Sequence, residues 1–297
     1  MAELDHSYNA VVVDPNTRMD QPFLAFSALP DRPKLSWPGG AKVALPVIIN
    51  VDAGDLATDP MGVLMFSYRD YGPRVGVFRL MGILDDLGIK GTLAISDALL
   101  DRSGVVVDEA LKRGWEIVGH GEKVTAGLSS TMSEADEKAY LQASYDAIKA
   151  RTGVAPRGWL SPGNAESSRT LPLLAEVGFD YTLDWGNDEQ PYEFIVPTGK
   201  LAALPYSPDT ADAAVIQAQA HTPWEFEAGL ADHLETLLVD GATTARVMTL
   251  GLQANISGQP FRSKYIRKFL TDAKASGGVW FATAAEIVDA YRQQTAA

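Results

Sequence analysis

The stretch Gly114-Trp115-Glu116-Ile117-Val118-Gly119-His120-Gly121-Glu122 combines a short strand pattern with a histidine directly after it. It predicts a strand over residues 116–118. The glycines on both sides of His120 allow a tight turn and a close approach of a ligand to the backbone. A single histidine at a strand end is most often a hydrogen-bonded structural residue. His120 becomes a catalytic candidate because polar residues also follow other predicted strands of this chain.

An earlier segment of the chain likewise combines a strand pattern with a polar residue after it. Residues 43–51 are mostly apolar and predict one strand covered on both faces, with Asp52 directly after it. Residues 56–73 predict a loop, whose length and tyrosines are typical of a functional lid. A helix is predicted over residues 77–87, because apolar residues recur at helical spacing and Gly88 ends the pattern, and a strand over residues 91–96.

Strand and helix patterns continue to alternate after His120. Asp184 and Trp185 end one predicted strand, and Gln253 follows another. Seven or eight such alternations favour a single β/α barrel, in which chemistry takes place at the C-terminal ends of the strands. An open doubly wound sheet gives a similar alternation and stays as the alternative. The remaining strands are predicted at residues 158–163, 181–185, 201–206, 246–252 and 279–282, and the remaining helices at 109–113, 133–148, 171–177, 224–238, 266–273 and after Thr283.

Composition limits the function classes. The 297 residues include no cysteine, which excludes disulfides, thiolate metal sites and a cysteine nucleophile and suits a reducing compartment. The net charge is −13 and no basic patch is found, so nucleic acid is not an expected partner. The first residues lack a secretory signal pattern, and no apolar run reaches the roughly 18 residues of a membrane span. We therefore expect a cytoplasmic protein with no membrane partner, in which residues 1–40 form an N-terminal arm.

Five motifs follow one another along the chain. They are Arg74-Val75-Gly76-Val77-Phe78-Arg79-Leu80, residues 114–121, Pro156-Arg157-Gly158-Trp159-Leu160-Ser161-Pro162-Gly163, residues 184–192 and Gly258-Gln259-Pro260-Phe261-Arg262. Together they resemble the polysaccharide deacetylase (NodB-homology) superfamily. The resemblance runs from about residue 42 to residue 293, and it is closest to the branch of metal-independent allantoinases and cyclic imide hydrolases. It implies a distorted (β/α) barrel of about seven parallel strands with outer helices, formed here by residues 41–297 and often assembled into homo-oligomers.

The chain departs from this superfamily at its metal ligands. Metal-dependent members hold a divalent ion with one aspartate and two histidines, beside a second aspartate that acts as base. The resemblance gives Asp52 the position of the base, but Ala53 replaces the metal-binding aspartate and Val124 the second histidine. One imidazole is too few ligands for a catalytic zinc site, so we expect no metal and no other cofactor. Glu122 or Asp55 as a substitute ligand is the less favoured alternative.

The polar residues that remain predict acid–base chemistry. Asp52, His120 and Asp184 are the candidate catalytic residues, with Asp184 expected to hold His120 in one tautomer. Without a metal ion, hydrogen-bond donors must stabilise the oxyanion, and backbone N–H groups around residues 161–163 are candidates. An activated ring amide, imide or ureide suits such a site better than an acetamido sugar, because its leaving group is a stabilised anion.

The predicted function is therefore a metal-independent hydrolase that opens a non-peptide C–N bond in a small cyclic amide, imide or ureide. A lyase or isomerase acting on a small carbonyl compound, and an inactive binding relative, stay open as alternatives. The expected partner is a small-molecule substrate. For Arg74, a role in the local fold or in a subunit contact comes before substrate binding. The candidate substrate-binding residues are Trp185, Gln253, Arg74, Pro162 and Glu122.

Overall fold

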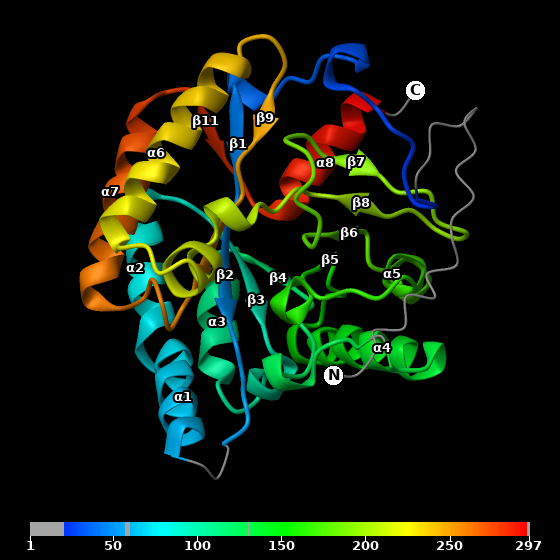
Figure 1. The fold of residues 1–297 in the computed structure, drawn as a ribbon, viewed down its shortest axis with the longest axis vertical. Coiled ribbons are helices and arrows are strands. Elements are labelled where there is room, and N and C mark those ends of the chain that lie inside the picture. The colour runs from blue at the N-terminus through cyan, green and yellow to red at the C-terminus, as the bar shows by residue number, and fades with distance from the viewer. Residues whose placement is uncertain (1–20, 57–59, 130, 296–297) are drawn as a thin grey trace.

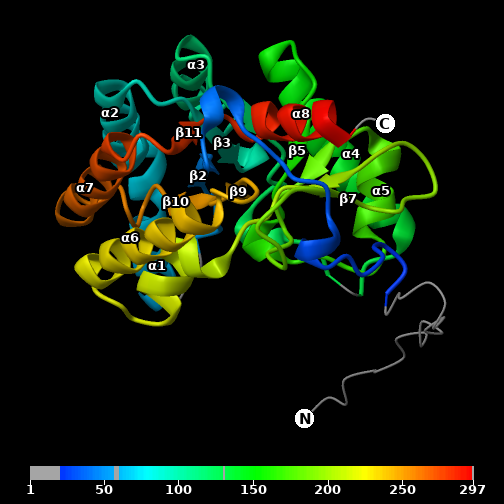
Figure 2. The same cartoon turned by 90° about the horizontal axis from the view of Figure 1, so that it is seen from above.

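The computed structural model describes residues 21–56, 60–129 and 131–295, and it shows parallel strands at the centre with helices outside them (Figures 1 and 2). The predicted fold class, a (β/α) barrel with outer helices, is confirmed. Most of the predicted arm, residues 1–20, lies outside the described residues. The strands are β1 Val43–Leu45, β2 Val47–Val51, β3 Gly91–Ile95, β4 Glu116–Val118, β5 Gly158–Trp159, β6 Tyr181–Thr182, β7 Tyr192–Glu193, β8 Ala202–Ala203, β9 Arg246–Val247, β10 Leu250–Gln253 and β11 Val279–Phe281.

The outer helices mostly follow the predicted pattern. Gly88 ends α2 in the left-handed conformation, which a glycine adopts without steric cost. The Ser133 side chain caps α4, and Thr222 and Glu225 form a capping box at the start of α6. The helices are α1 Pro60–Tyr71, α2 Val77–Leu87, α3 Gly104–Lys112, α4 Glu134–Thr152, α5 Thr170–Val177, α6 Pro223–Asp240, α7 Pro260–Ala275 and α8 Ala284–Thr295.

The central sheet brings the ends of its strands to one edge. Its order is β10-β2-β3-β4 and all three pairings are parallel. Gln253 is the partner of Asn50 in the register, and Val51 is the partner of Ile95. Every residue of β2 and β3 is buried, as expected for parallel strands covered on both faces. Residues that follow these strands therefore meet at the same side of the molecule.

The prediction of one continuous strand over residues 43–51 is wrong. Pro46 divides it into β1, which pairs with β9 and β11, and β2, which pairs with β10 and β3. Proline has no N–H to donate to a neighbouring strand, so a break in the ladder at this position is expected. The apolar pattern alone did not reveal the break, because both halves are fully buried.

A further sheet continues from β4. Its order is β5-β6-β8-β7, with only β7 antiparallel to its neighbour. Two isolated parallel bridges connect the sheets: Gly119 with Trp159, between β4 and β5, and Ala211 with Gly251, between the segment after β8 and β10. The ends of β4, β5, β6, β8 and β10 therefore surround a common space.

The prediction of a lid loop over residues 56–73 is also wrong. Residues 60–71 form helix α1, which continues into a π-helical turn over Gly72–Gly76. Several of its apolar side chains, those of Met61, Val63 and Leu64 among them, are exposed, so no buried stripe marks the helix in the sequence. Tyr68 accepts a hydrogen bond from Arg262, and Tyr71 accepts one from Arg79.

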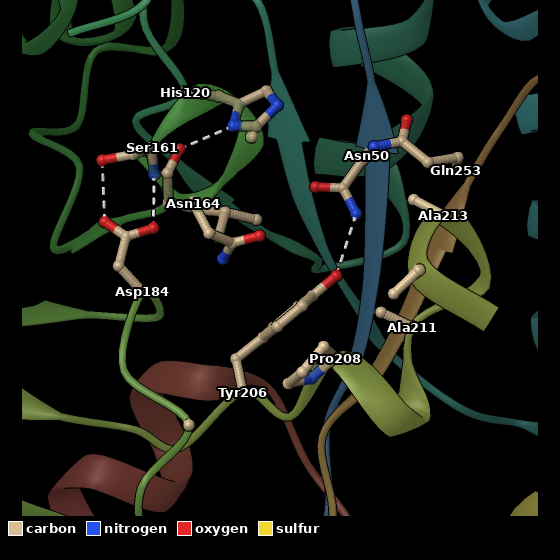
Figure 3. Close-up of a pocket in the computed structure, with 14 residues that line it drawn as sticks. Asn50, His120, Ser161, Asn164, Asp184, Tyr206, Pro208, Ala211, Ala213 and Gln253 are labelled. Atoms are coloured by element: carbon tan, nitrogen blue, oxygen red, sulfur yellow. Dashed lines mark hydrogen bonds between the residues drawn. The ribbon is translucent and has the colours of Figure 1, made fainter. Parts of the chain in front are cut away.

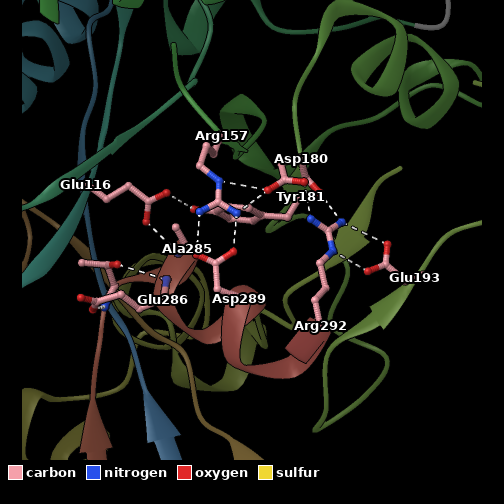
Figure 4. A network of polar contacts seen from close by, with 10 residues as sticks. Glu116, Arg157, Asp180, Tyr181, Glu193, Ala285, Glu286, Asp289 and Arg292 are labelled. Atoms are coloured by element: carbon pink, nitrogen blue, oxygen red, sulfur yellow. Dashed lines mark hydrogen bonds and ion pairs between the residues drawn. The ribbon is translucent and has the colours of Figure 1, made fainter. Parts of the chain in front are cut away.

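A polar network clamps α8 to the opposite end of the strands (Figure 4). Glu116, at the start of β4, accepts hydrogen bonds from the Tyr181 hydroxyl (2.6 Å) and the Ala285 amide (2.9 Å) in the first turn of α8. Arg157 joins Asp180 to Asp289 of α8. This network lies where the strands begin, away from the edge that collects the candidate site residues. Among the helices that the structure describes, none is both long and apolar enough to cross a bilayer.

Candidate functional site

A cavity of about 500 Å³ opens where the strands end (Figure 3). Each of β2, β4, β5, β6, β8 and β10 contributes to its wall, either directly or through the residues that follow the strand. Its volume lies within the range of small-molecule binding sites. The lining residues are Asn50, His120, Leu160, Ser161, Gly163, Asn164, Asp184, Gly186, Tyr206, Pro208, Ala211, Ala213, Ala214 and Gln253.

His120 lies in this wall with both ring nitrogens engaged. Its side chain is only 3% exposed. Nδ1 lies 2.6 Å from the carbonyl oxygen of Leu160, and Nε2 lies 2.7 Å from Oδ1 of Asp52. Asp52 follows β2 two residues after Asn50, so the pleat directs both side chains to the same face. The structure thus brings together the aspartate and the histidine that the sequence predicts as a pair.

The two contacts determine how many protons the pair carries. A carbonyl oxygen can only accept, so Nδ1 of His120 donates to Leu160, and one more proton must lie between Nε2 and Asp52. Burial lowers the pKa of His120, but the Asp52 carboxylate and the Leu160 carbonyl outweigh burial and raise it above its ordinary value. The contact with Asp52 therefore favours the protonated form of His120.

Asp184 contacts Ser161 and not His120, so the predicted role of Asp184 in fixing the tautomer is wrong. Its two carboxylate oxygens accept from the Ser161 amide and the Ser161 hydroxyl, each at 2.8 Å. The tautomer is set instead by the Leu160 carbonyl. The same geometry engages the Ser161 amide, which was a predicted oxyanion donor. Burial raises the pKa of Asp184.

Three carboxamides line the cavity. Asn50 donates to the Tyr206 hydroxyl at 3.5 Å, and Figure 3 shows the Asn164 amide directed into the space between His120 and Tyr206. The side-chain oxygen Oε1 of Gln253 is buried and has no hydrogen-bond partner among the described residues. Carboxamides both donate and accept, so this wall complements a ligand that carries amide or ureide groups.

Sequence reasoning missed two carboxyl groups at this site. Asp212 accepts from the amides of Gln253 (2.9 Å) and Ser257 (3.2 Å) and thereby fixes the chain after β10, and burial raises its pKa to about 7. Glu166 accepts from the Trp185 indole at 2.8 Å. Burial and the charge of Asp184 raise the pKa of Glu166 to about 9. Neither residue follows a strand directly, so the pattern that identified His120 does not reveal them.

The structure does not bring the other predicted substrate-binding residues into the cavity wall. Arg74 is exposed on the π-helical turn and pairs with Asp70. Glu122 is exposed and pairs with Lys123. Pro162 is buried behind its neighbours Ser161 and Gly163, which do line the cavity. Of the five residues predicted to bind substrate, only Gln253 lines the cavity. Trp185 does not line it, but its chain neighbours Asp184 and Gly186 do.

The donor set does not fit the metal centre of the metal-dependent relatives. Both nitrogens of His120 are already engaged, and Ala53 and Val124 offer no donor atom. Asp55, a possible substitute, is occupied by Lys123 and Thr125, both at 2.9 Å. Over the described residues, no group of three or more histidine, aspartate or glutamate side chains is placed to hold a metal ion.

The chain is similar in sequence to known polysaccharide deacetylases. Residues 58–182 match the family model described as polysaccharide deacetylase. A curated protein of Schizosaccharomyces pombe (strain 972 / ATCC 24843), whose name places it among polysaccharide deacetylases, is 23% identical over 297 residues. That alignment covers 86% of this chain and 92% of the yeast protein.

Solved structures superimpose on most of this chain. The crystal structure of Puue allantoinase superimposes with a TM-score of 0.80 at 25% identity, covering 88% of this chain and 94% of the other. A Pseudomonas aeruginosa PAO1 protein assigned by name to the polysaccharide deacetylases gives 0.80 at 25% identity, covering 89% and 95%. A Mycobacterium smegmatis protein assigned in the same way gives 0.77 at 29% identity, covering 88% and 94%.

Proposed function

Because the chain belongs to the polysaccharide deacetylase superfamily, with an allantoinase among its structural relatives, we propose that it is a metal-independent hydrolase. Its substrate is a small cyclic amide, imide or ureide, in which it opens a C–N bond. The observation that carries this proposal is the 2.7 Å contact of Asp52 with His120, a residue in the wall of a cavity that three carboxamides also line.

In this proposal Asp52 and His120 move the protons of hydrolysis. The Asp52 side chain is 10% exposed, which leaves it access to a water molecule, and it takes a proton as that water attacks the ring carbonyl. The C–N bond then breaks, and the pair returns a proton to the departing ring nitrogen. The His120 imidazolium and the carboxamide N–H groups stabilise the oxyanion, in place of a Lewis acid. Protons and charge balance without any cofactor.

The carboxamides explain why a ring amide suits the cavity. A ring amide or ureide presents alternating N–H and C=O groups, which pair with the Asn50, Asn164 and Gln253 amides. The free Oε1 of Gln253 offers an acceptor for a substrate N–H. A lactone lacks that donor and would leave this buried oxygen unpaired, which costs roughly 1–3 kcal/mol.

A substrate screen tests the proposal. Small ring amides, imides, ureides, lactones and aldol-type adducts are incubated with the protein, and products are identified by mass spectrometry. We expect ring opening with the addition of one water to a ring amide, imide or ureide. A product formed without added water would instead show a lyase or isomerase.

Two substitutions test the residue roles. We expect His120→Ala and Asp52→Ala each to lower kcat/KM by roughly 10²–10⁴-fold, because each removes half of the acid–base pair. The exposed His221→Ala and Asp232→Ala serve as matched controls and should leave the rate unchanged. Treatment with a chelator should have no effect. If the chelator abolished activity and zinc restored it, the metal-independent mechanism would be wrong.

A further inference from the structure

Several hydrogen-bond donors near the acid–base pair are already engaged inside the protein. Both ring nitrogens of His120 contact protein acceptors. The Ser161 amide donates to Asp184 at 2.8 Å, and Pro162 has no N–H to offer. A hydrolase without a metal ion needs donors directed at the carbonyl oxygen that gains charge during the reaction. A further donor in the cavity wall is therefore expected.

Tyr206 presents a hydroxyl group whose proton is not used within the protein. The residue lines the cavity and is 8% exposed. Its oxygen accepts from Nδ2 of Asn50 at 3.5 Å, and the hydroxyl makes no other hydrogen bond among the described residues. A phenol accepts and donates at the same time, so its O–H stays available to a bound molecule. Figure 3 shows the ring extending into the cavity from the side opposite His120, with the hydroxyl at its tip.

The backbone around Tyr206 fixes the position of this hydroxyl. The Tyr206 amide donates to the Trp185 carbonyl at 3.0 Å. Two glycines pack against the residue: a Cβ added at Gly186 would stand 2.7 Å from the Tyr206 carbonyl oxygen, and one added at Gly251 would stand 1.9 Å from the hydroxyl oxygen. Neither position leaves space for a side chain. The hydroxyl is therefore preorganised, as a donor that stabilises a transition state has to be.

The hydroxyl of Tyr206 keeps its proton at ordinary pH. Burial, the largest cause, and the negative charge of Asp212 both disfavour a phenolate, and together they raise the pKa of Tyr206 well above its ordinary value. The hydrogen bond from Asn50 acts in the opposite direction and polarises the O–H group without removing its proton. Tyr206 is thus a neutral donor facing the cavity.

We propose that Tyr206 is a further catalytic residue, which donates a hydrogen bond from its O–H to the substrate carbonyl oxygen as negative charge develops there. This inference rests on the proposed function. Water bonds to the carbonyl carbon and gives a proton to Asp52, while the C=O π electrons move onto the oxygen that Tyr206 contacts. The C=O bond then re-forms, the C–N bond breaks, and the acid–base pair returns the proton to the ring nitrogen. Tyr206 keeps its own proton throughout, so protons and electrons balance.

The kinetic test removes only the hydroxyl oxygen. With a ring substrate identified, Tyr206→Phe should lower kcat by roughly 10²–10³-fold and leave KM within about twofold, because the contact strengthens in the transition state. Tyr145→Phe makes the same change at a half-buried ring on α4, which packs against Phe179, and should leave kcat and KM unchanged. Circular dichroism should show both variants folded. A kcat of Tyr206→Phe within twofold of the wild type, or a rise in KM that accounts for the whole loss, would overturn the proposal.

A second test needs no turnover and uses succinimide, a simple ring imide, as the probe. The Raman difference between wild type and Tyr206→Phe isolates the ring bands of Tyr206, whose intensity ratio differs between a hydroxyl that only accepts and one that also donates. We expect the accepting state in the free protein and the donating state with succinimide. No change in this ratio at any succinimide concentration would contradict the donor role.

The two tests separate this inference from the proposed function. If succinimide changes the ratio but no ring compound is hydrolysed, the proposed function is wrong and Tyr206 is a donor for binding only, which overturns its catalytic role. If a ring amide, imide or ureide is hydrolysed equally fast by the wild type and Tyr206→Phe, the proposed function holds and the role of Tyr206 is wrong. Hydrolysis by the wild type with the expected loss in Tyr206→Phe supports both.

Discussion

At the scale of single residues, the charge of His120 follows from what each nitrogen faces. Leu160 accepts from Nδ1, so the imidazole carries a proton there, and the Asp52 carboxylate favours a second proton in the contact with Nε2. Burial alone would lower the pKa of His120, and the aspartate reverses that direction. The contact that would prepare the pair for proton transfer in the proposed mechanism also stabilises the folded state.

Asp52→Asn should show this link between charge and stability. The His120 contribution is fully present below the unfolded pKa of 6.5 and is lost as pH rises through the raised folded value. We expect the variant to lose up to about 3 kcal/mol of unfolding free energy near pH 6, and the gap to the wild type to narrow at higher pH. Urea unfolding at a series of pH values measures it. A gap that widens with pH would contradict the imidazolium assignment.

The sequence reveals those site residues that directly follow buried strands. Asp52 and His120 stand after β2 and β4, and parallel strands bring such positions together. Glu166 and Asp212 lie in polar connecting segments, where a buried carboxyl group looks like a surface residue. Arg74 was considered because it begins a motif, yet Arg79 of that motif makes the internal contact, with the Gly258 carbonyl.

At the scale of elements, strand β10 and the segment after β8 pack without side-chain space between them. Tyr206 lies against Gly251, where an added Cβ would stand 1.9 Å from the tyrosine hydroxyl. The same tyrosine lines the cavity and binds Asn50. The glycine therefore fixes where one wall of the cavity stands.

Gly251→Ala should push Tyr206 out of its place. We expect a loss of roughly 1–3 kcal/mol in unfolding free energy from overpacking, together with weaker ligand binding. Gly229→Ala is the control, because a Cβ at that position on α6 meets nothing within 4 Å. It should be neutral or stabilise the protein by up to about 1 kcal/mol. Thermal unfolding of both variants provides the comparison, and equal stabilities would show that Tyr206 yields freely.

Helices were predictable where a capping side chain marks the start or a glycine marks the end. Gly88 marks the end of α2, Ser133 the start of α4, and Thr283 precedes α8. Helix α1 was missed because its apolar side chains face outward, which removes the periodicity that indicates a buried helix. The break at Pro46 was missed because full burial on both sides of it resembles one long strand.

At the scale of the whole molecule, residues 21–40 tie the first strand to the last helix. Trp37 is buried, donates to the Arg246 carbonyl at 2.7 Å and packs near Trp280 with ring centres 5.9 Å apart. Ser36 and Gln294 of α8 are joined by hydrogen bonds. The described part of the arm thus packs on the domain itself.

Trp37→Ala should destabilise the entire fold. Removing a buried indole leaves a cavity and an unpaired carbonyl, so we expect a loss of roughly 3–5 kcal/mol in unfolding free energy. Phe26→Ala in the same segment is the control, since Phe26 is 67% exposed and its loss should be within about 0.5 kcal/mol of neutral. Urea unfolding curves measure both. Similar losses for the two variants would show that the arm contributes no packing of its own.

The two sides of the cavity are built from different kinds of structure, strand ends on one side and turns on the other. The proposed acid–base pair, Asp52 and His120, follows β2 and β4, strands held by neighbours in a buried sheet. The facing wall, residues 161–164 and 206–214, consists of short turns, with Asn164 in a left-handed conformation at φ 54°. Under the proposed function, substitutions in those turns can reshape substrate preference while Asp52 and His120 keep their geometry. New substrates are then accessible by changing one wall only.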